Sequence, residues 1–110
     1  MTGHLHVYTT VDSADAAESL ARAALGARLA ACVQIIGPVR SLYWREGVLD
    51  DTLEWQLLIK TPAADYPALE AHIGASHGYS TPEIVATEIV AGSAEYLRWL
   101  DAPDQGLSPR

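Results

Sequence analysis

Alternating apolar and polar residues predict four β-strands in this chain. Residues 5–11 are rich in valine, tyrosine and threonine, which favour strands. Residues 53–60 alternate most regularly. Leucine, tryptophan, leucine and isoleucine occupy the odd positions, which predicts that this face of the strand is buried. Residues 31–44 predict a strand with a Gly-Pro interruption, which indicates a bulge, a bend or a sheet edge because proline cannot donate to a ladder. Residues 82–91 predict the fourth strand.

Apolar residues at helical spacing predict helices between these strands. In residues 14–28 they recur at i, i+3, i+4 and i+7, after an aspartate and a serine that are both suitable N-caps. Thr61-Pro62 predicts the start of a second helix, with threonine as N-cap and proline at the first position. His77-Gly78 predicts the end of that helix, with the glycine in the left-handed conformation.

The order of these elements predicts the fold class. A strand, a helix, two strands, a helix and a strand are followed by a short third helix, which Ser93 caps. This order is typical of an α+β fold of the ferredoxin-like βαββαβ type, an antiparallel sheet with helices on one face and here with a long hairpin between its second and third strands. We assign residues 1–102 to a single domain and residues 103–110 to a flexible C-terminal tail.

The hairpin of residues 31–61 is longer than a four-stranded core needs. It carries Trp44 and Trp55, so an isolated chain would expose strand edges and apolar surface. The hairpin therefore predicts an oligomer. We interpret both tryptophans as packing anchors at or near subunit contacts rather than as residues that stack on a ligand.

Composition and charge exclude several classes of protein. With 49% hydrophobic and 19% charged residues, the 110-residue chain is typical of a globular domain. Its net charge of -7 and single lysine argue against a nucleic-acid partner. No apolar run approaches the length of a membrane span. The N-terminus does not resemble a signal peptide and the chain has one cysteine, so we expect a cytoplasmic protein.

The residues offer little support for enzymatic chemistry. Phosphate-binding glycine loops, paired cysteines, the HExxH motif and the nucleophile-elbow motif are all missing from the sequence, so we predict that the protein is not an enzyme. The segment richest in functional residue types is 77–83. There His77 and Glu83 are candidate ligands of a divalent cation, since imidazole and carboxylate suit such an ion. The alternative is that His77 stabilises the end of a helix through its dipole.

Three further residues are candidates with open alternatives. Cys32 is either a soft-metal ligand or a small buried hydrophobe on a strand. Glu54 and Lys60 are either a charged pair buried in an oligomer or part of a solvated face.

A series of short motifs extends from Val7 to Leu100. In order, the motifs are Ala30-Ala31-Cys32-Val33, Ser41-Leu42-Tyr43-Trp44, Glu46-Gly47, Leu58-Ile59-Lys60-Thr61, His77 with Tyr79, Pro82-Glu83-Ile84, and Tyr96-Leu97 with Trp99. In this order and spacing they resemble the CutA family of divalent-cation tolerance proteins. The resemblance implies a ferredoxin-like fold and a homotrimer in which long hairpins pair between subunits. It also implies tolerance to copper and other divalent ions.

The resemblance gives the candidate residues their expected roles. The metal ligands, for Cu²⁺ or another divalent cation, would be His77, Glu83 and Cys32. A ligand cleft would contain Tyr79, Lys60 and Glu54. Trimer contacts would involve Trp44, Trp55 and Tyr43. Since the family is similar in architecture to PII signalling proteins, the alternative function is a signalling module. Such a module would bind a small anionic metabolite in inter-subunit clefts and relay the signal to a protein partner.

Overall fold

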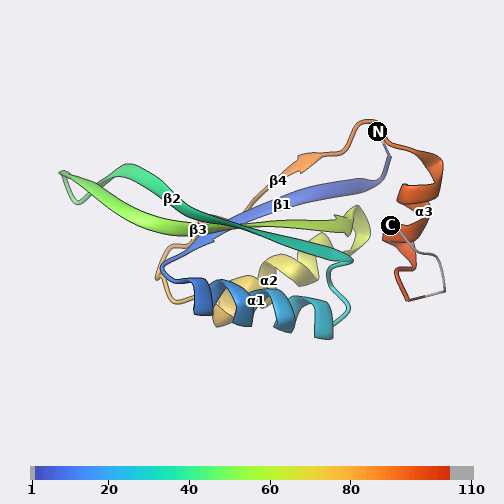
Figure 1. Ribbon diagram of the computed structural model, residues 1–110, viewed down its shortest axis with the longest axis horizontal. Helices are drawn as coiled ribbons and strands as arrows, with labels where there is room; N and C mark the ends of the chain where they lie inside the picture. The colour runs from blue at the N-terminus through green and yellow to red at the C-terminus, as the bar shows by residue number, and fades with distance from the viewer. Residues whose placement is uncertain (1, 105–110) are drawn as a thin grey trace.

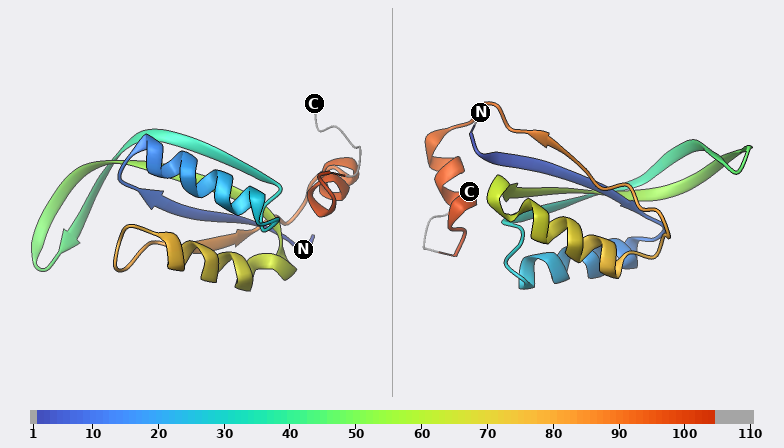
Figure 2. Two further views of the ribbon diagram at one scale, coloured as in Figure 1. Left: turned by 90° about the horizontal axis from the view of Figure 1, so that it is seen from below. Right: turned by 180° about the vertical axis from the view of Figure 1, so that it is seen from behind.

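The computed structural model describes residues 2–104 of the chain. Its strands form one sheet in the order β2-β3-β1-β4, and every neighbouring pair is antiparallel. Helices α1 and α2 lie side by side on one face of this sheet (Figure 1, Figure 2). In chain order the elements are β1 (His4–Val11), α1 (Ala14–Gly26), β2 (Cys32–Arg45), β3 (Val48–Pro62), the 3-10 helix η1 (Ala63–Asp65), α2 (Tyr66–Ser76), β4 (Val85–Glu88) and α3 (Ala94–Asp101). The predicted α+β, ferredoxin-like class is confirmed.

The core lies between the sheet and helices α1 and α2. Alternate residues of β1 and β3 point into it, and Val7, Leu57 and Ile59 are fully buried. The helices close the core with small and branched side chains: Ala17, Leu20, Ala21 and Ala24 of α1, and Leu69 and Ile73 of α2. The predicted buried face of β3 does not extend to Leu53, which is 58% exposed because the hairpin continues beyond the helices (Figure 1).

Strand β2 is continuous through its Gly-Pro step. Its register against β3 shifts between Ile36 and Val39, which confirms the predicted irregularity. Because β2 is an edge strand, it tolerates a proline that cannot donate to a ladder. The indole of Trp55 fills the space beside Gly37, where an added Cβ would lie 2.3 Å from Trp55 Cδ1.

The predicted start of the second helix at Thr61 is wrong. Thr61 belongs to β3, pairs with Leu5 of β1, and donates its hydroxyl hydrogen to the Leu29 carbonyl at 2.9 Å. The ladder with β1 continues as far as Pro62, so strand pairing outweighs the local capping signal. Helix α2 starts at Tyr66 instead, and its first turn accommodates a proline, whose missing N–H is not needed there.

The second helix ends where it was predicted to end but with a different cap, and the fourth strand is shorter than predicted. Helix α2 ends at Ser76 without the predicted left-handed glycine, because His77 is already extended and Gly78 does not adopt a positive φ. Strand β4 spans only Val85–Glu88, rather than 82–91, because β1 pairs with it only from Leu5 to Tyr8. The predicted C-terminal tail lies largely outside the described residues.

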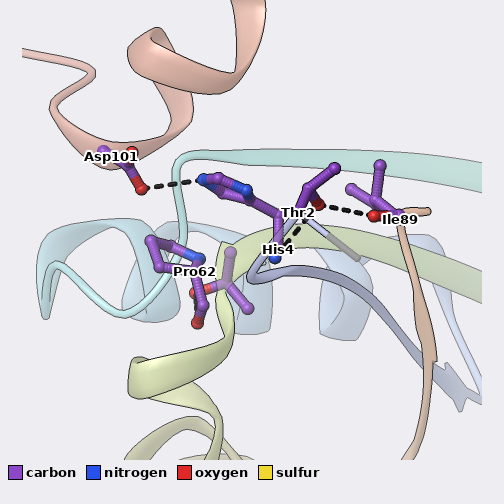
Figure 3. A network of polar contacts seen from close by, with 6 residues as sticks. Thr2, His4, Pro62, Ile89 and Asp101 are labelled. Atoms are coloured by element: carbon purple, nitrogen blue, oxygen red, sulfur yellow. Dashed lines mark hydrogen bonds and ion pairs between the residues drawn. The ribbon is translucent and has the colours of Figure 1, made fainter. Parts of the chain in front are cut away.

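Helix α3 packs at the end of the sheet where β1 begins (Figure 1). His4 Nε2 lies 2.8 Å from Asp101 Oδ1, and the His4 side chain is buried although Asp101 is exposed (Figure 3). The Thr2 hydroxyl donates to the Ile89 carbonyl in the segment that leads into α3 (Figure 3). These contacts fasten the C-terminal helix to the first strand and place its side chains against the end of β3.

Candidate ligand-binding cleft

A cleft of about 1090 Å³ lies between the β2–β3 hairpin and the loop that follows α2. One side is formed by the outer parts of β2 and β3, and the other by residues that precede β4. The fold brings five of the predicted site residues into its lining: Tyr43, Trp44, Glu54, Tyr79 and Glu83. These residues come from separate parts of the chain, so the cleft is a product of tertiary structure.

Tyr79 and Glu54 form the central hydrogen bond of the cleft. The Tyr79 hydroxyl donates to Glu54 Oε2 at 2.8 Å, and Glu54 is only 6% exposed. Burial, together with this bond to a carboxylate, raises the pKa of the Tyr79 phenol. Tyr79 therefore remains a hydrogen-bond donor over the physiological pH range, and it provides the partner that a buried carboxylate requires.

His77 holds the loop against the sheet rather than lining the cleft. Its Nε2 lies 2.8 Å from the Thr10 carbonyl oxygen, and its Nδ1 lies 3.0 Å from the backbone nitrogen of Tyr79. The carbonyl can only accept and the backbone N–H can only donate. This network assigns a neutral ring with the proton on Nε2. Both ring nitrogens are thus engaged, and a metal ion at His77 would have to replace one of these bonds.

The charges of the cleft that have no partner are negative. Arg40 pairs with Asp51 at 2.6 Å, and Arg45 pairs with Asp50, so both arginines of the cleft are neutralised by carboxylates. Within residues 2–104, Glu83 makes no ion pair and no side-chain hydrogen bond. The electrostatics of the cleft therefore favour a cation over an anion.

Cys32 and Lys60 lie away from this cleft. They face each other across β2 and β3, and Lys60 is six residues along β3 from Glu54, which corresponds to roughly 20 Å. One chain therefore cannot form the Glu54–Lys60 pair. Across the described residues, no three histidine, cysteine, aspartate or glutamate side chains form a group that could hold a metal ion.

The two hairpin tryptophans have different environments. Trp55 is partly buried against the core, and Trp44 is 72% exposed near the hairpin tip. Other large apolar residues of the hairpin are also exposed: Ile35, Ile36, Leu42, Tyr43, Val48, Leu49 and Leu53.

Two partners of the site residues were not predicted. The Thr10 carbonyl that binds His77 gives no sequence signal, because any residue has a carbonyl. His6, which lies opposite Lys60 in the β1–β3 ladder, could have been found by aligning the two strands in antiparallel register.

Comparison with known proteins identifies the family. Residues 5–103 match the sequence model of the family described as "CutA1 divalent ion tolerance protein". The chain belongs to this family. A CutA protein of Thermus thermophilus has a solved structure that superposes with a TM-score of 0.85 at 40% identity, covering 88% of this chain and 94% of that one.

Two other CutA relatives extend the comparison. The structure of "Periplasmic divalent cation tolerance protein CutA" from Archaeoglobus fulgidus has a TM-score of 0.86 at 36% identity, and the match covers 89% of this chain and 95% of that one. "Protein CutA 1, chloroplastic" of Oryza sativa subsp. japonica is 40% identical over 86% of this chain, which spans only 53% of that relative's length. Because these two relatives are named for different compartments, family membership does not support the cytoplasmic prediction. Among the described residues, no helix has the length and apolar character to cross a membrane.

Proposed function

We propose that the protein is a non-enzymatic homotrimer that binds a divalent cation, copper among them, in the cleft beside the β2–β3 hairpin. The observation that carries the proposal is the charge of that cleft: its arginines are paired with aspartates, whereas Glu83 is not paired within the described chain. Family membership supports the same conclusion, since divalent ion tolerance is the property for which the family is named.

The exposed apolar residues of the hairpin support the oligomer. Trp44 is 72% exposed, and Leu42, Val48, Leu49 and Leu53 each exceed half exposure, which is unusual for neighbouring residues on a stable monomer. The sheet also ends in two open edges, β2 and β4, whose backbone groups can pair with another chain. The number of three subunits comes from the resemblance to CutA proteins.

Within one chain, Glu83 and Glu54 are the two carboxylates that we propose as ligands of the cation. Glu83 is exposed on the cleft, and Glu54 offers a second carboxylate that Tyr79 orients at 2.8 Å. His77 of the same loop and Cys32 of a neighbouring subunit would complete the coordination as the softer donors that copper prefers. An ion bound to His77 would replace one of the two hydrogen bonds of its ring, to the Tyr79 backbone nitrogen or to the Thr10 carbonyl oxygen.

Calorimetric titration with Cu²⁺ and Zn²⁺ tests the metal site. We expect Glu83→Gln to weaken binding by at least about tenfold, the effect of losing one charged contact. Glu95→Gln is the matched control, because it makes the same chemical change in α3, outside the cleft. Equal binding heats for the wild type, Glu83→Gln and His77→Ala would show that the cation does not bind here.

Sedimentation equilibrium tests the assembly. We expect a mass three times that of the 11.8 kDa chain, and a shift toward smaller species in Trp44→Ser. The Glu95→Gln control should keep the wild-type mass. An 11.8 kDa species at micromolar concentration would refute the oligomer.

Lys60 favours a second candidate function, a PII-like signalling module that binds a small anion. It is the only lysine of the chain, and it has no carboxylate partner within the described residues. This function predicts that metal-free protein binds an anion and that the bound anion changes the affinity for a protein partner. Calorimetry of the metal-free protein against a panel of small anions would test its first step.

A further inference from the structure

A row of hydrogen-bond donors crosses the sheet at the end opposite the cleft. The strand registers place Cys32, Lys60, His6 and Thr87 side by side on β2, β3, β1 and β4. They occupy the face that α1 and α2 leave open, since Val7 beside His6 and Ile59 beside Lys60 are buried in the core, and paired residues of adjacent strands share a face. Tyr96 of α3 reaches the same place, with its hydroxyl 3.5 Å from Lys60 Nζ. Each of these side chains can donate a hydrogen bond.

The charge at the centre of the row has no counter-ion in the described chain. Four arginines, Arg22, Arg28, Arg40 and Arg45, each form an ion pair with a carboxylate. Lys60 is partly buried, and its described contacts are with Tyr96, through the hydroxyl and through the ring at 5.7 Å. A phenol cannot satisfy three ammonium hydrogens or neutralise the charge.

Asp101, a carboxylate of the same helix as Tyr96, already has a partner. It binds His4, two residues from His6 along β1, at 2.8 Å, and it forms no ion pair with Lys60. The same contact fixes α3 so that Tyr96 lies over Lys60. Within the described residues, the fold thus leaves the Lys60 side chain without a carboxylate partner and places a phenol hydroxyl beside it.

His6 supplies a second donor next to Lys60. The two residues are directly opposite in the β1–β3 ladder, where side chains on adjacent strands lie about 5 Å apart. Burial, and then the neighbouring ammonium, lower the pKa of His6. The ring is therefore neutral at pH 7 and has one N–H to donate, and no described hydrogen bond uses it. One oxyanion could contact both side chains at once.

We infer that the Lys60, His6 and Tyr96 side chains form a binding site for the phosphate or carboxylate group of a small anion. Lys60 supplies the charge, and His6 and Tyr96 supply neutral donors from β1 and α3. Thr87 and Cys32 flank the site on either side. This inference rests on the anion-binding function proposed above, and it places that function at a site separate from the carboxylate-lined cleft.

A carboxylate of a neighbouring subunit is the rival partner for Lys60. An interface ion pair would also satisfy the ammonium, but it would make Lys60 important for assembly and would leave no site for a free anion. The two explanations therefore differ in what Lys60→Gln changes: anion affinity in one case, and the mass of the assembly in the other.

Titration of the full-length protein with inorganic phosphate and with citrate, followed by NMR of the His6 ring, tests the site. We expect a saturable shift with at least one anion, and the anion that binds tells whether phosphate or carboxylate is preferred. Lys60→Gln should weaken this binding by at least about tenfold, the effect of losing a charged hydrogen bond. Lys60→Arg should keep most of it. Arg98→Gln is the matched control, since it removes one positive charge from α3 elsewhere on the surface.

Bound anion should also raise the pKa of His6, because it offsets the charge of Lys60. If neither anion gives a saturable response in the His6 ring or in calorimetry of the metal-free protein, the anion-binding function and this site both fail. If an anion binds with equal affinity to wild type and Lys60→Gln, only the placement of the site is wrong. A smaller assembly in Lys60→Gln without anion binding in the wild type would establish the interface ion pair instead.

Discussion

Replacing Tyr79 with phenylalanine removes one hydroxyl from the cleft and leaves a buried carboxylate without its partner. Glu54 is 6% exposed and accepts the Tyr79 hydrogen bond at 2.8 Å. Hydrogen bonds to charged groups contribute about 1.5–3 kcal/mol, and Tyr79 is partly buried, so we expect a loss of about 2 kcal/mol. This corresponds to roughly a 30-fold change in the ratio of folded to unfolded protein.

Urea unfolding at fixed protein concentration measures this loss. With a typical denaturant dependence, about 2 kcal/mol lowers the midpoint by about 1 M. Tyr66→Phe is the matched control: its hydroxyl donates to Glu70 at 2.7 Å, but that pair is solvent-exposed on one face of α2. The control should lose only about 0.5 kcal/mol or less.

A double-mutant cycle identifies the cause. Glu54→Gln keeps an acceptor but removes the charge, so Tyr79→Phe should cost less in that background, with a coupling of about 1 kcal/mol. If Tyr79→Phe destabilises the protein no more than Tyr66→Phe does, burial of Glu54 does not depend on Tyr79 and the reasoning fails.

Two other changes test local features of the fold. Gly37→Ala would place a Cβ 2.3 Å from Trp55 Cδ1, so we expect urea unfolding to show a loss of about 1–3 kcal/mol. Gly74→Ala on α2 is the control: its added Cβ meets no atom within 4 Å, so the folded protein should gain up to about 1 kcal/mol. Equal effects of the two changes would rule out the close approach of Gly37 to the indole. Because the folded pKa of His6 is below 6.5, its contribution to stability is complete above pH 6.5 and is lost as pH falls through the folded pKa. His6→Gln should therefore lose less stability than wild type between pH 7.5 and 5, and identical losses would contradict the lowered pKa.

Local sequence signals failed where a distant strand competed with them. Thr61 followed by proline is a strong helix start, but β1 offers Thr61 a ladder partner and Leu29 offers its hydroxyl an acceptor. Likewise, residues 82–91 favour a strand throughout, but only four of them find a partner on β1. Strand length depends on what lies beside it, which a local pattern does not contain.

Periodicity and short motifs along the chain were enough to predict the element order, most of the buried face of β3, the long hairpin and the family. Each of these signals is contained in a few neighbouring residues. Which candidate residues meet depended on the folded arrangement. Tyr79 reaches Glu54 and His77 reaches Thr10 only because the loop after α2 returns across the sheet. Lys60 and Glu54, although both are candidates, stay apart because they lie six residues from each other on one extended strand, whose fixed rise per residue separates them.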